Sequence, residues 1–136
     1  MVAEMQIFQR VVVKVGTSIL SSADGVRSER VAHLARELAT LRSTGKEVVL
    51  VTSGAVAAGM SRLGMRERPK TIPAKQAAAA VGQIALMALY EKYFSVHDLR
   101  VAQVLLTHDD LANRRRYLNA KHTMLTLLEA EVIPIV

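Results

Sequence analysis

The residues best suited to chemistry follow two strongly apolar segments of the sequence. Lys14 lies inside the first segment, the run Gly16-Thr17-Ser18 follows it directly, and the run Ser53-Gly54-Ala55 follows the second segment. Glycine and small hydroxyl residues near a helix start leave backbone N–H groups free, and such a surface suits the oxygens of a phosphate or carboxylate. Both runs also form ordinary turns, so the residues alone leave phosphate binding as one of two interpretations.

Lys14 is the only charge within the apolar run Val11–Val15. A buried ammonium is costly unless it is paired or opens onto a site. One interpretation makes Lys14 a point charge on a phosphoryl group in transfer. The other lets the side chain reach solvent at the end of a strand. Neither a Walker A pattern nor a G-x-G-x-x-G run after a strand occurs, which argues against a P-loop and against a dinucleotide fold.

The elements that must position these residues alternate along the chain. Apolar segments at 10–15, 47–52, 100–106 and 132–136 predict strands, and the first is typical of a strand buried on both faces. Three helices are predicted between these strands. The first has its N-cap at Ser28 and its C-terminal stop at Gly45, the second extends from 55 to about 63, and the third extends from 75 to 94. Thr107 and Asp110 predict the cap of a further helical stretch, which reaches about 130 with a break near Asn113.

Alternating strands and helices predict an α/β fold, in which parallel strands are joined by crossovers and helices cover both faces. Ligands of such sheets bind at the carboxyl ends of the strands, where the segments after 15 and after 52 are expected to meet. Gly82, inside the long Ala-rich helix, is expected to permit close packing against a neighbour. The two prolines and the charges of Arg66–Pro73 predict a loop.

Composition sets the class of protein. The 136 residues predict one domain, because 51% hydrophobic residues are enough for a core. The absence of cysteine excludes disulfides and Cys-based metal sites, and it fits a reducing compartment. The opening residues have no apolar run of signal-peptide length, and Ala77–Ala80 is too short to span a bilayer. We therefore expect a cytoplasmic protein with no membrane partner.

The net charge of +6 is compatible with an anionic partner. Arg114–Arg116 is the densest basic run, and it has two interpretations. It is either a solvated helix face beside an acidic neighbour such as Asp109 or Asp110, or a surface for a nucleotide or nucleic acid. Because no basic segment carries interleaved aromatic residues, we expect no nucleic-acid partner.

Several blocks of the sequence together resemble the glutamate 5-kinase family of the amino-acid kinase superfamily. The blocks are Val12–Ser18, Val51–Gly59, Lys75–Gln83, Gln103–Thr107, Arg116–Ala120 and Val132–Ile135. They occur in the family's order and cover nearly the whole chain from Arg10 onward. The resemblance implies a three-layer αβα sandwich around a mostly parallel sheet. It also implies phosphorylation of the γ-carboxylate of L-glutamate by ATP with Mg²⁺, the first step of proline biosynthesis.

The resemblance also implies roles for single residues. Lys14 would contact the phosphates of ATP and stabilise the transferring group, while Gly16, Thr17 and Ser18 would shape the phosphate turn. Ser53, with the backbone of Gly54 and Ala55, would hold glutamate. No residue is implied as a direct metal ligand, and Lys75 and Gln76 receive no chemical role. Proline would be a feedback inhibitor, and the complete protein is expected to be a homo-oligomer.

The sequence departs from the family after 132–136, where an Asn-Glu-Asn-Asp type run is expected and missing. The nucleotide-base pocket, a second catalytic lysine and an aspartate that organises the lysines are missing too. We therefore expect residues 1–136 to be the N-terminal part of an amino-acid kinase domain and to be inactive alone. The alternatives are another acylphosphate-forming or phosphate kinase of the superfamily, the kinase half of a bifunctional enzyme, or a non-catalytic basic binding module.

Overall fold

A parallel four-stranded sheet forms the middle of the molecule. The computed structural model describes residues 8–22 and 25–136. The strands are β1 (Arg10–Val15), β4 (Glu47–Thr52), β5 (Arg100–Gln103) and β6 (Val132–Ile135). They lie in the order β1-β4-β6-β5, and every neighbouring pair is parallel. This order puts β1 and β5 at the two edges.

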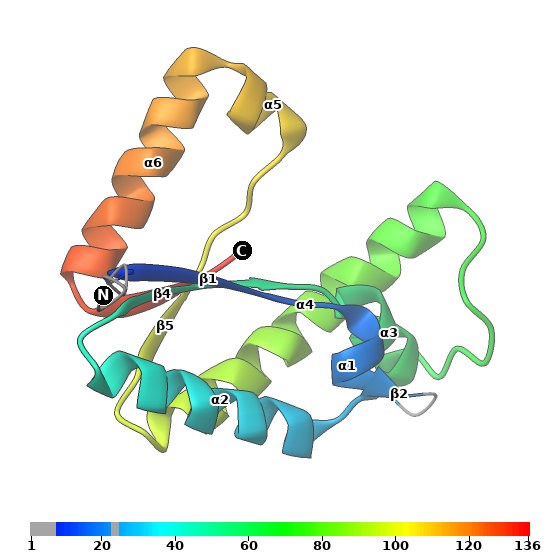
Figure 1. Cartoon of the computed structure of the whole chain (residues 1–136). Coiled ribbons are helices and arrows are strands. Elements are labelled where there is room, and N and C mark those ends of the chain that lie inside the picture. The colour runs from blue at the N-terminus through cyan, green and yellow to red at the C-terminus, as the bar shows by residue number, and fades with distance from the viewer. Residues whose placement is uncertain (1–7, 23–24) are drawn as a thin grey trace, which may run out of the picture.

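Helices lie on both faces of the sheet, as predicted. On one face are α2 (Ser28–Ser43) and α4 (Ile72–Ser95), and α3 (Ala55–Arg62) packs along α4. On the other face are α5 (His108–Ala112) and α6 (Arg114–Glu129), so Figure 1 shows three layers. The prediction of an α/β fold with a mostly parallel sheet between helices is confirmed.

The main core lies between the sheet and the α2–α4 layer. Valine, leucine and isoleucine side chains from the strands meet apolar side chains from these helices. At its centre, the Tyr90 and Phe94 rings of α4 meet edge to face, with their centroids 5.8 Å apart. The buried members are Val15, Leu20, Val31, Ala35, Leu38, Val48, Leu50, Leu86, Tyr90, Phe94, Ile133 and Ile135.

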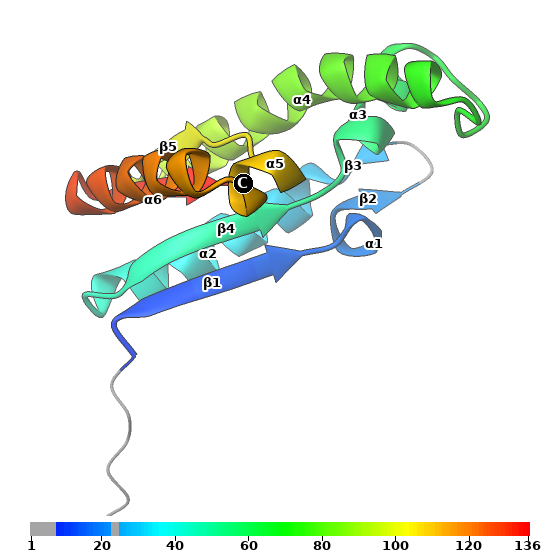
Figure 2. The ribbon, with the colours of Figure 1, turned by 90° about the horizontal axis from the view of Figure 1, so that it is seen from above.

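The prediction that the first strand is buried on both faces is wrong. Burial alternates along β1, with Val15 buried, Val12 61% exposed and Lys14 exposed. Figure 2 shows that α6 lies over the β5 and β6 side, and that no described helix covers β1 on this face. A run of β-branched residues predicts a strand, but it does not report how many faces the neighbouring elements cover.

Three predicted boundaries move by a few residues. Ser28 is the first residue of α2, and Arg27 occupies the N-cap. α4 begins at Ile72, so Pro73 lies in its first turn, where a missing N–H costs no helix hydrogen bond. β5 ends at Gln103 instead of 106, and its register with β6 extends from Arg100 opposite Val132 to Gln103 opposite Ile135.

Two small elements after β1 were not predicted. They are α1 (Thr17–Leu20) and a two-stranded ribbon made of β2 (Ser21–Ser22) and β3 (Gly25–Val26). Leu20 is 1% exposed and belongs to the core, so α1 is fixed by packing against the rest of the domain. Four- and two-residue elements are too short for a periodic pattern to reveal them.

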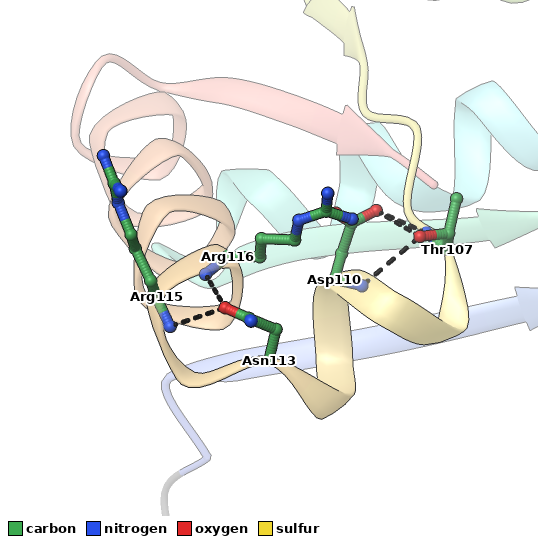
Figure 3. Close-up of polar contacts among 5 residues, drawn as sticks. All are labelled: Thr107, Asp110, Asn113, Arg115 and Arg116. Carbon is green, nitrogen blue, oxygen red and sulfur yellow. Dashed lines mark hydrogen bonds and ion pairs between the residues drawn. The ribbon is translucent and has the colours of Figure 1, made fainter.

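The predicted break near Asn113 separates α5 from α6 (Figure 3). Thr107 Oγ1 accepts a hydrogen bond from the Asp110 backbone N–H at 3.3 Å, and Asp110 Oδ2 accepts one from the Thr107 N–H at 2.8 Å. Asn113 Oδ1 then accepts from the backbone N–H groups of Arg115 and Arg116. The predicted cap at Thr107 is a capping box, and Asn113 caps the next helix.

Arg114, Arg115 and Arg116 are all exposed, in the first turn of α6. Arg116 Nη1 lies 3.9 Å from Asp110 Oδ1, so the run has the acidic neighbour that one of its two interpretations required. The pKa of Asp110 is lowered, first by its hydrogen bonds with the Thr107 side chain and backbone and less by the Arg116 charge.

Gly82 brings α4 into backbone contact with α3, as expected. A Cβ atom at Gly82 would lie 1.8 Å from the Ala55 carbonyl oxygen and 2.3 Å from the Gly59 nitrogen. From the side of α3, a Cβ atom added at Gly59 would lie 1.7 Å from the Ala78 carbonyl oxygen of α4. The two glycines therefore set the position of α3, whose first residue is Ala55.

By length and composition, α4 is the single helix among the described residues that could cross a membrane. One side of it belongs to the core, since Leu86, Tyr90 and Phe94 are 1% exposed or less. A core helix of an α/β domain passes the same test of length and composition, so α4 gives no argument for a membrane protein.

Candidate functional site

The two segments singled out in the sequence lie side by side at the carboxyl ends of β1 and β4. The parallel register pairs Val15 with Thr52, so the residues that follow each strand emerge together. Thr17 Oγ1 donates a hydrogen bond to Ser53 Oγ at 3.0 Å, and the Ser53 backbone N–H donates to the Val15 carbonyl at 3.2 Å. Their predicted meeting at this edge of the sheet is confirmed.

Gly54 turns the chain from β4 into α3. Its φ of 112° lies in the left-handed region, which a residue with a Cβ atom adopts only with strain. A short extended-to-helical turn here keeps Ser53 exposed while Gly54 itself is buried. The Ala58 N–H donates to the Gly54 carbonyl at 2.9 Å, which starts the helix.

A cavity of about 670 Å³ opens beside these residues. Its volume lies within the range usual for sites of small ligands. Its walls come from α1 and β2, from the end of β4, from α3 and α4, from the segments after α3 and β5, and from Val136 after β6. The lining residues are Thr17, Ser21, Ser22, Thr52, Ser53, Gly54, Ala55, Val56, Ala57, Met60, Arg66, Arg68, Gln83, Leu86, Val104, Leu105, Leu106 and Val136.

The predicted site residues divide into two groups. Thr17, Ser53, Gly54 and Ala55 line the cavity, and all four come from the two predicted runs. The other group, Lys14, Gly16 and Ser18, does not line it.

Lys14 is exposed, on the side of β1 that faces away from the core. It pairs in register with Val51, and Val12, two residues earlier on the same face, is exposed too. This placement agrees with the interpretation in which the ammonium reaches solvent at the strand end. It also leaves the ammonium free for a ligand bound over this open face. Gly16 has a φ of −82°, which any residue can adopt, and it precedes α1.

Thr52 is a cavity residue that sequence reasoning missed. Its hydroxyl lies 2.6 Å from the Tyr90 hydroxyl, which belongs to the core side of α4. Burial raises the pKa of Tyr90, and the hydrogen bond to Thr52 opposes that rise. Tyr90 therefore remains neutral at physiological pH and ties the end of β4 to α4. Thr52 is the polar residue that ends the apolar strand β4, which is the signal that could have identified it.

Arg66 and Arg68 were also missed as site residues. Both come from the segment between α3 and α4, which was predicted as a loop, and both are exposed at the cavity wall. Gln83 reaches the same cavity from α4. The charges of this loop were visible in the sequence. That the loop borders the carboxyl ends of the strands follows only from how α3 packs on α4.

The donors of the site suit an anion more than a metal ion. Its polar lining consists of hydroxyls, an amide, backbone groups and two guanidiniums, with no aspartate or glutamate. Across residues 8–22 and 25–136, no group of three or more His, Cys, Asp or Glu side chains is arranged to hold a metal ion. Oxygen-rich ligands, such as carboxylates and phosphates, fit such a donor set.

Comparison with known proteins identifies the family of the chain. The profile of the family described as "Amino acid kinase family" matches residues 9–136. The glutamate 5-kinase of Moorella thermoacetica is 57% identical over 129 residues, covering 94% of this chain and 34% of that protein. That of Aromatoleum aromaticum is 54% identical over 129 residues, covering 94% of this chain and 35% of its own. That of Thermus thermophilus is 55% identical over 128 residues, covering 94% of this chain and 35% of its own.

The chain thus spans about a third of the length of these relatives. The resemblance to glutamate 5-kinases noted in the sequence is confirmed at this level of identity. Because the family profile matches nearly the whole chain, and because the parallel sheet and its crossovers agree with it, this polypeptide belongs to the amino acid kinase family.

Proposed function

We propose that this polypeptide serves the ATP-dependent phosphorylation of the γ-carboxylate of L-glutamate to L-glutamyl 5-phosphate, the first step of proline biosynthesis. The observation that carries the proposal is the Thr17–Ser53 hydrogen bond at the wall of a 670 Å³ cavity. It joins the two segments that the glutamate 5-kinase resemblance pairs. The names of the relatives, at 54–57% identity, support the same substrate.

The chemistry requires little from an enzymatic base. A γ-carboxyl group with an ordinary pKa of about 4.3 is already ionised at neutral pH and can attack a phosphoryl group directly. Rate enhancement then rests on aligning the two substrates and on stabilising the charge of the transferring group. In this proposal Ser53, with the backbone of Gly54 and Ala55, holds glutamate inside the cavity.

Lys14 is assigned to the phosphates of ATP, together with Gly16, Thr17 and Ser18. Lys14 and Ser18 are exposed outside the cavity, whereas Thr17 is shared between the turn and the cavity. A nucleotide over the open face of β1 would therefore approach glutamate across Thr17 and Ser53. An ammonium placed there neutralises phosphate charge without the desolvation that a buried lysine suffers.

ATP fits the donors present, since hydroxyls, backbone N–H groups and an exposed lysine are ordinary phosphate partners. Mg²⁺ is proposed only as the companion of ATP. The described residues provide no carboxylate at the cavity to hold it, so no step is assigned to the metal.

A direct assay tests the proposal. The acyl phosphate product reacts with hydroxylamine to give a hydroxamate that is measured by its ferric colour. We propose that the isolated 136-residue chain is inactive alone and that a longer form containing it makes hydroxamate only with both ATP and L-glutamate. Hydroxamate formation by the isolated chain would refute the first statement. Its absence from the longer form would refute the second.

In an active form, Ser53→Ala should raise the KM for glutamate with little change in the KM for ATP. A lost hydrogen bond to a charged ligand is worth about 1.5–3 kcal/mol, or roughly a 10- to 150-fold change. Ser43→Ala, which alters an exposed serine at the end of α2, is the control and should change neither constant. An unchanged glutamate KM in Ser53→Ala would remove Ser53 from the substrate site.

The other expectations from the resemblance remain part of this proposal. They are feedback inhibition by proline, a homo-oligomer and a cytoplasmic location. A different kinase of the superfamily would share the fold and is distinguished by profiling carboxylate and phosphate acceptors. A basic binding module centred on Arg114–Arg116 would instead bind oligonucleotides with a steep dependence on salt.

A further inference from the structure

The cavity has a charge imbalance that the proposed roles of Ser53, Gly54 and Ala55 do not use. Two of its lining residues, Arg66 and Arg68, are always cationic, and none of them is acidic. Neither guanidinium takes part in an ion pair or hydrogen bond with any described residue. Two unpaired guanidiniums beside a cavity of ligand size attract an anionic group.

The segment that carries the two arginines is anchored at both ends. Gly64, with a φ of 64°, ends the turn after α3, and the Met65 N–H donates to the Met60 carbonyl at 2.9 Å. After the arginines, Pro69 is buried, and the Thr71 hydroxyl accepts from the Ala74 N–H at 3.4 Å. The arginines therefore lie on a short stretch held between two fixed points.

We propose that Arg66 and Arg68 bind the carboxylate of the amino-acid substrate that is not phosphorylated, its α-carboxylate. This inference rests on the proposed function, and it assigns to a loop outside the resembling blocks the task of fixing the substrate's orientation. Arginine is suited to this task, because its planar fork donates two parallel hydrogen bonds to a carboxylate.

The position of the arginines favours the substrate carboxylate over a phosphate of ATP. Between Ser53 and Arg66 the wall is formed by α3, whose eight residues extend about 12 Å along the helix axis. Val56, Ala57 and Met60 of this helix line the cavity between the two polar ends. Lys14 and Ser18, assigned to the phosphates, lie outside the cavity altogether. The arginines thus bind the end of the substrate that is remote from phosphoryl transfer.

Calorimetric titration of the full chain with three probes tests the inference. L-Glutamate carries both carboxylates, L-isoglutamine lacks the α-carboxylate, and inorganic phosphate represents the nucleotide. We expect the wild-type chain to prefer glutamate over isoglutamine by about tenfold or more, as charged hydrogen bonds predict. The double variant Arg66→Ala/Arg68→Ala should lose that preference while its affinity for isoglutamine stays within about twofold. The double variant Arg66→Lys/Arg68→Lys should restore part of the glutamate preference, since lysine returns the positive charge without the paired donors of a guanidinium.

The matched control is Arg62→Ala, which removes a nearby exposed arginine that does not line the cavity. It should leave the glutamate preference intact, and unfolding temperatures of all variants should agree, because the three arginines are exposed.

Several outcomes would overturn the inference. In the double variant, the affinities for glutamate and isoglutamine could fall equally, or the affinity for phosphate could fall more than that for glutamate. Arg62→Ala could lose the glutamate preference to the same extent, or the wild-type chain could fail to bind glutamate. The proposed function fails separately. If the arginines discriminate the α-carboxylate but a longer form makes no hydroxamate, the carboxylate site stands without the kinase reaction.

Discussion

At the scale of single residues, Lys14 shows how far a side chain's type can be interpreted. A lone lysine in an apolar strand has two explanations, a ligand contact or escape to solvent. The structure places the ammonium in solvent on the uncovered face of β1, beside the strand end that leads to Thr17. The escape to solvent is observed, whereas contact with a phosphate stays a prediction, with which an exposed ammonium is compatible because it costs little to keep charged.

Lys14→Ala should therefore reduce turnover far more than stability. Loss of one charge that stabilises the transferring group is expected to lower kcat by about 10²-fold or more in an active form. The free energy of unfolding should change by less than about 0.5 kcal/mol, because the side chain is exposed. Lys70→Ala removes an exposed lysine outside the cavity, and it is the control for the loss of one positive charge at the surface. A large drop in unfolding temperature with normal turnover would make Lys14 a structural residue.

At the scale of elements, the α3–α4 pair holds the site in place. Gly59 and Gly82 allow the two helix backbones to touch, and this contact fixes α3 at the end of β4. The cavity wall made by α3, and the loop with Arg66 and Arg68 that follows it, depend on the same contact.

Gly82→Ala should destabilise the domain. The added methyl would lie 1.8 Å from the Ala55 carbonyl oxygen, so the helices must separate, and forced overpacking usually costs about 1–3 kcal/mol. Gly16→Ala is a matched substitution, because a Cβ there meets nothing within 4 Å and the φ of −82° is ordinary. Urea unfolding of both variants measures the difference. Equal stabilities would mean that the helices adjust freely.

The capping box of α5 should weaken in acid. The folded-state pKa of Asp110 is lowered from its ordinary 3.8, so its contribution is present above that value and is lost as the pH falls through the lowered pKa. Protection factors of the α5 amides, which are exchange rates corrected for the intrinsic dependence of exchange on pH, should decrease as the pH is lowered from 6 to about 2. Asp110→Asn should remove most of this pH dependence. An α5 that stays equally protected in the variant and in acid would argue against a role for the carboxylate.

At the scale of the whole molecule, the sheet has one closed face and one face that is covered only in part. Tyr90 connects the core to the cavity, since its ring packs against Phe94 in the core while its hydroxyl contacts Thr52 in the cavity wall. Stability and site geometry are joined at this residue.

Alkaline titration tests this connection. The pKa of Tyr90 is raised by burial, so its stabilising contribution is complete below pH 10 and is lost as the pH rises through the raised value. We expect the stability of the wild-type chain to fall above pH 10, and the stability of Tyr90→Phe to fall less steeply over the same pH range. Thermal unfolding at pH 8 and at higher pH in steps measures both. Tyr93→Phe, a half-buried tyrosine of the same helix, is the control. Identical slopes for the wild type and Tyr90→Phe would refute the prediction.

From the amino-acid sequence one could predict the order of the main strands and helices, the cap at Thr107, the break near Asn113, the close approach at Gly82, and the meeting of the turns after β1 and β4. These depend on local chemistry or on the rule that parallel strands end at one edge. Tertiary structure alone decided which face of β1 is open, and that Thr52, Arg66, Arg68 and Gln83 share a cavity with Ser53. The reason is physical: a residue's type reveals its local preference, whereas its neighbours across the fold are set by helix packing over many residues.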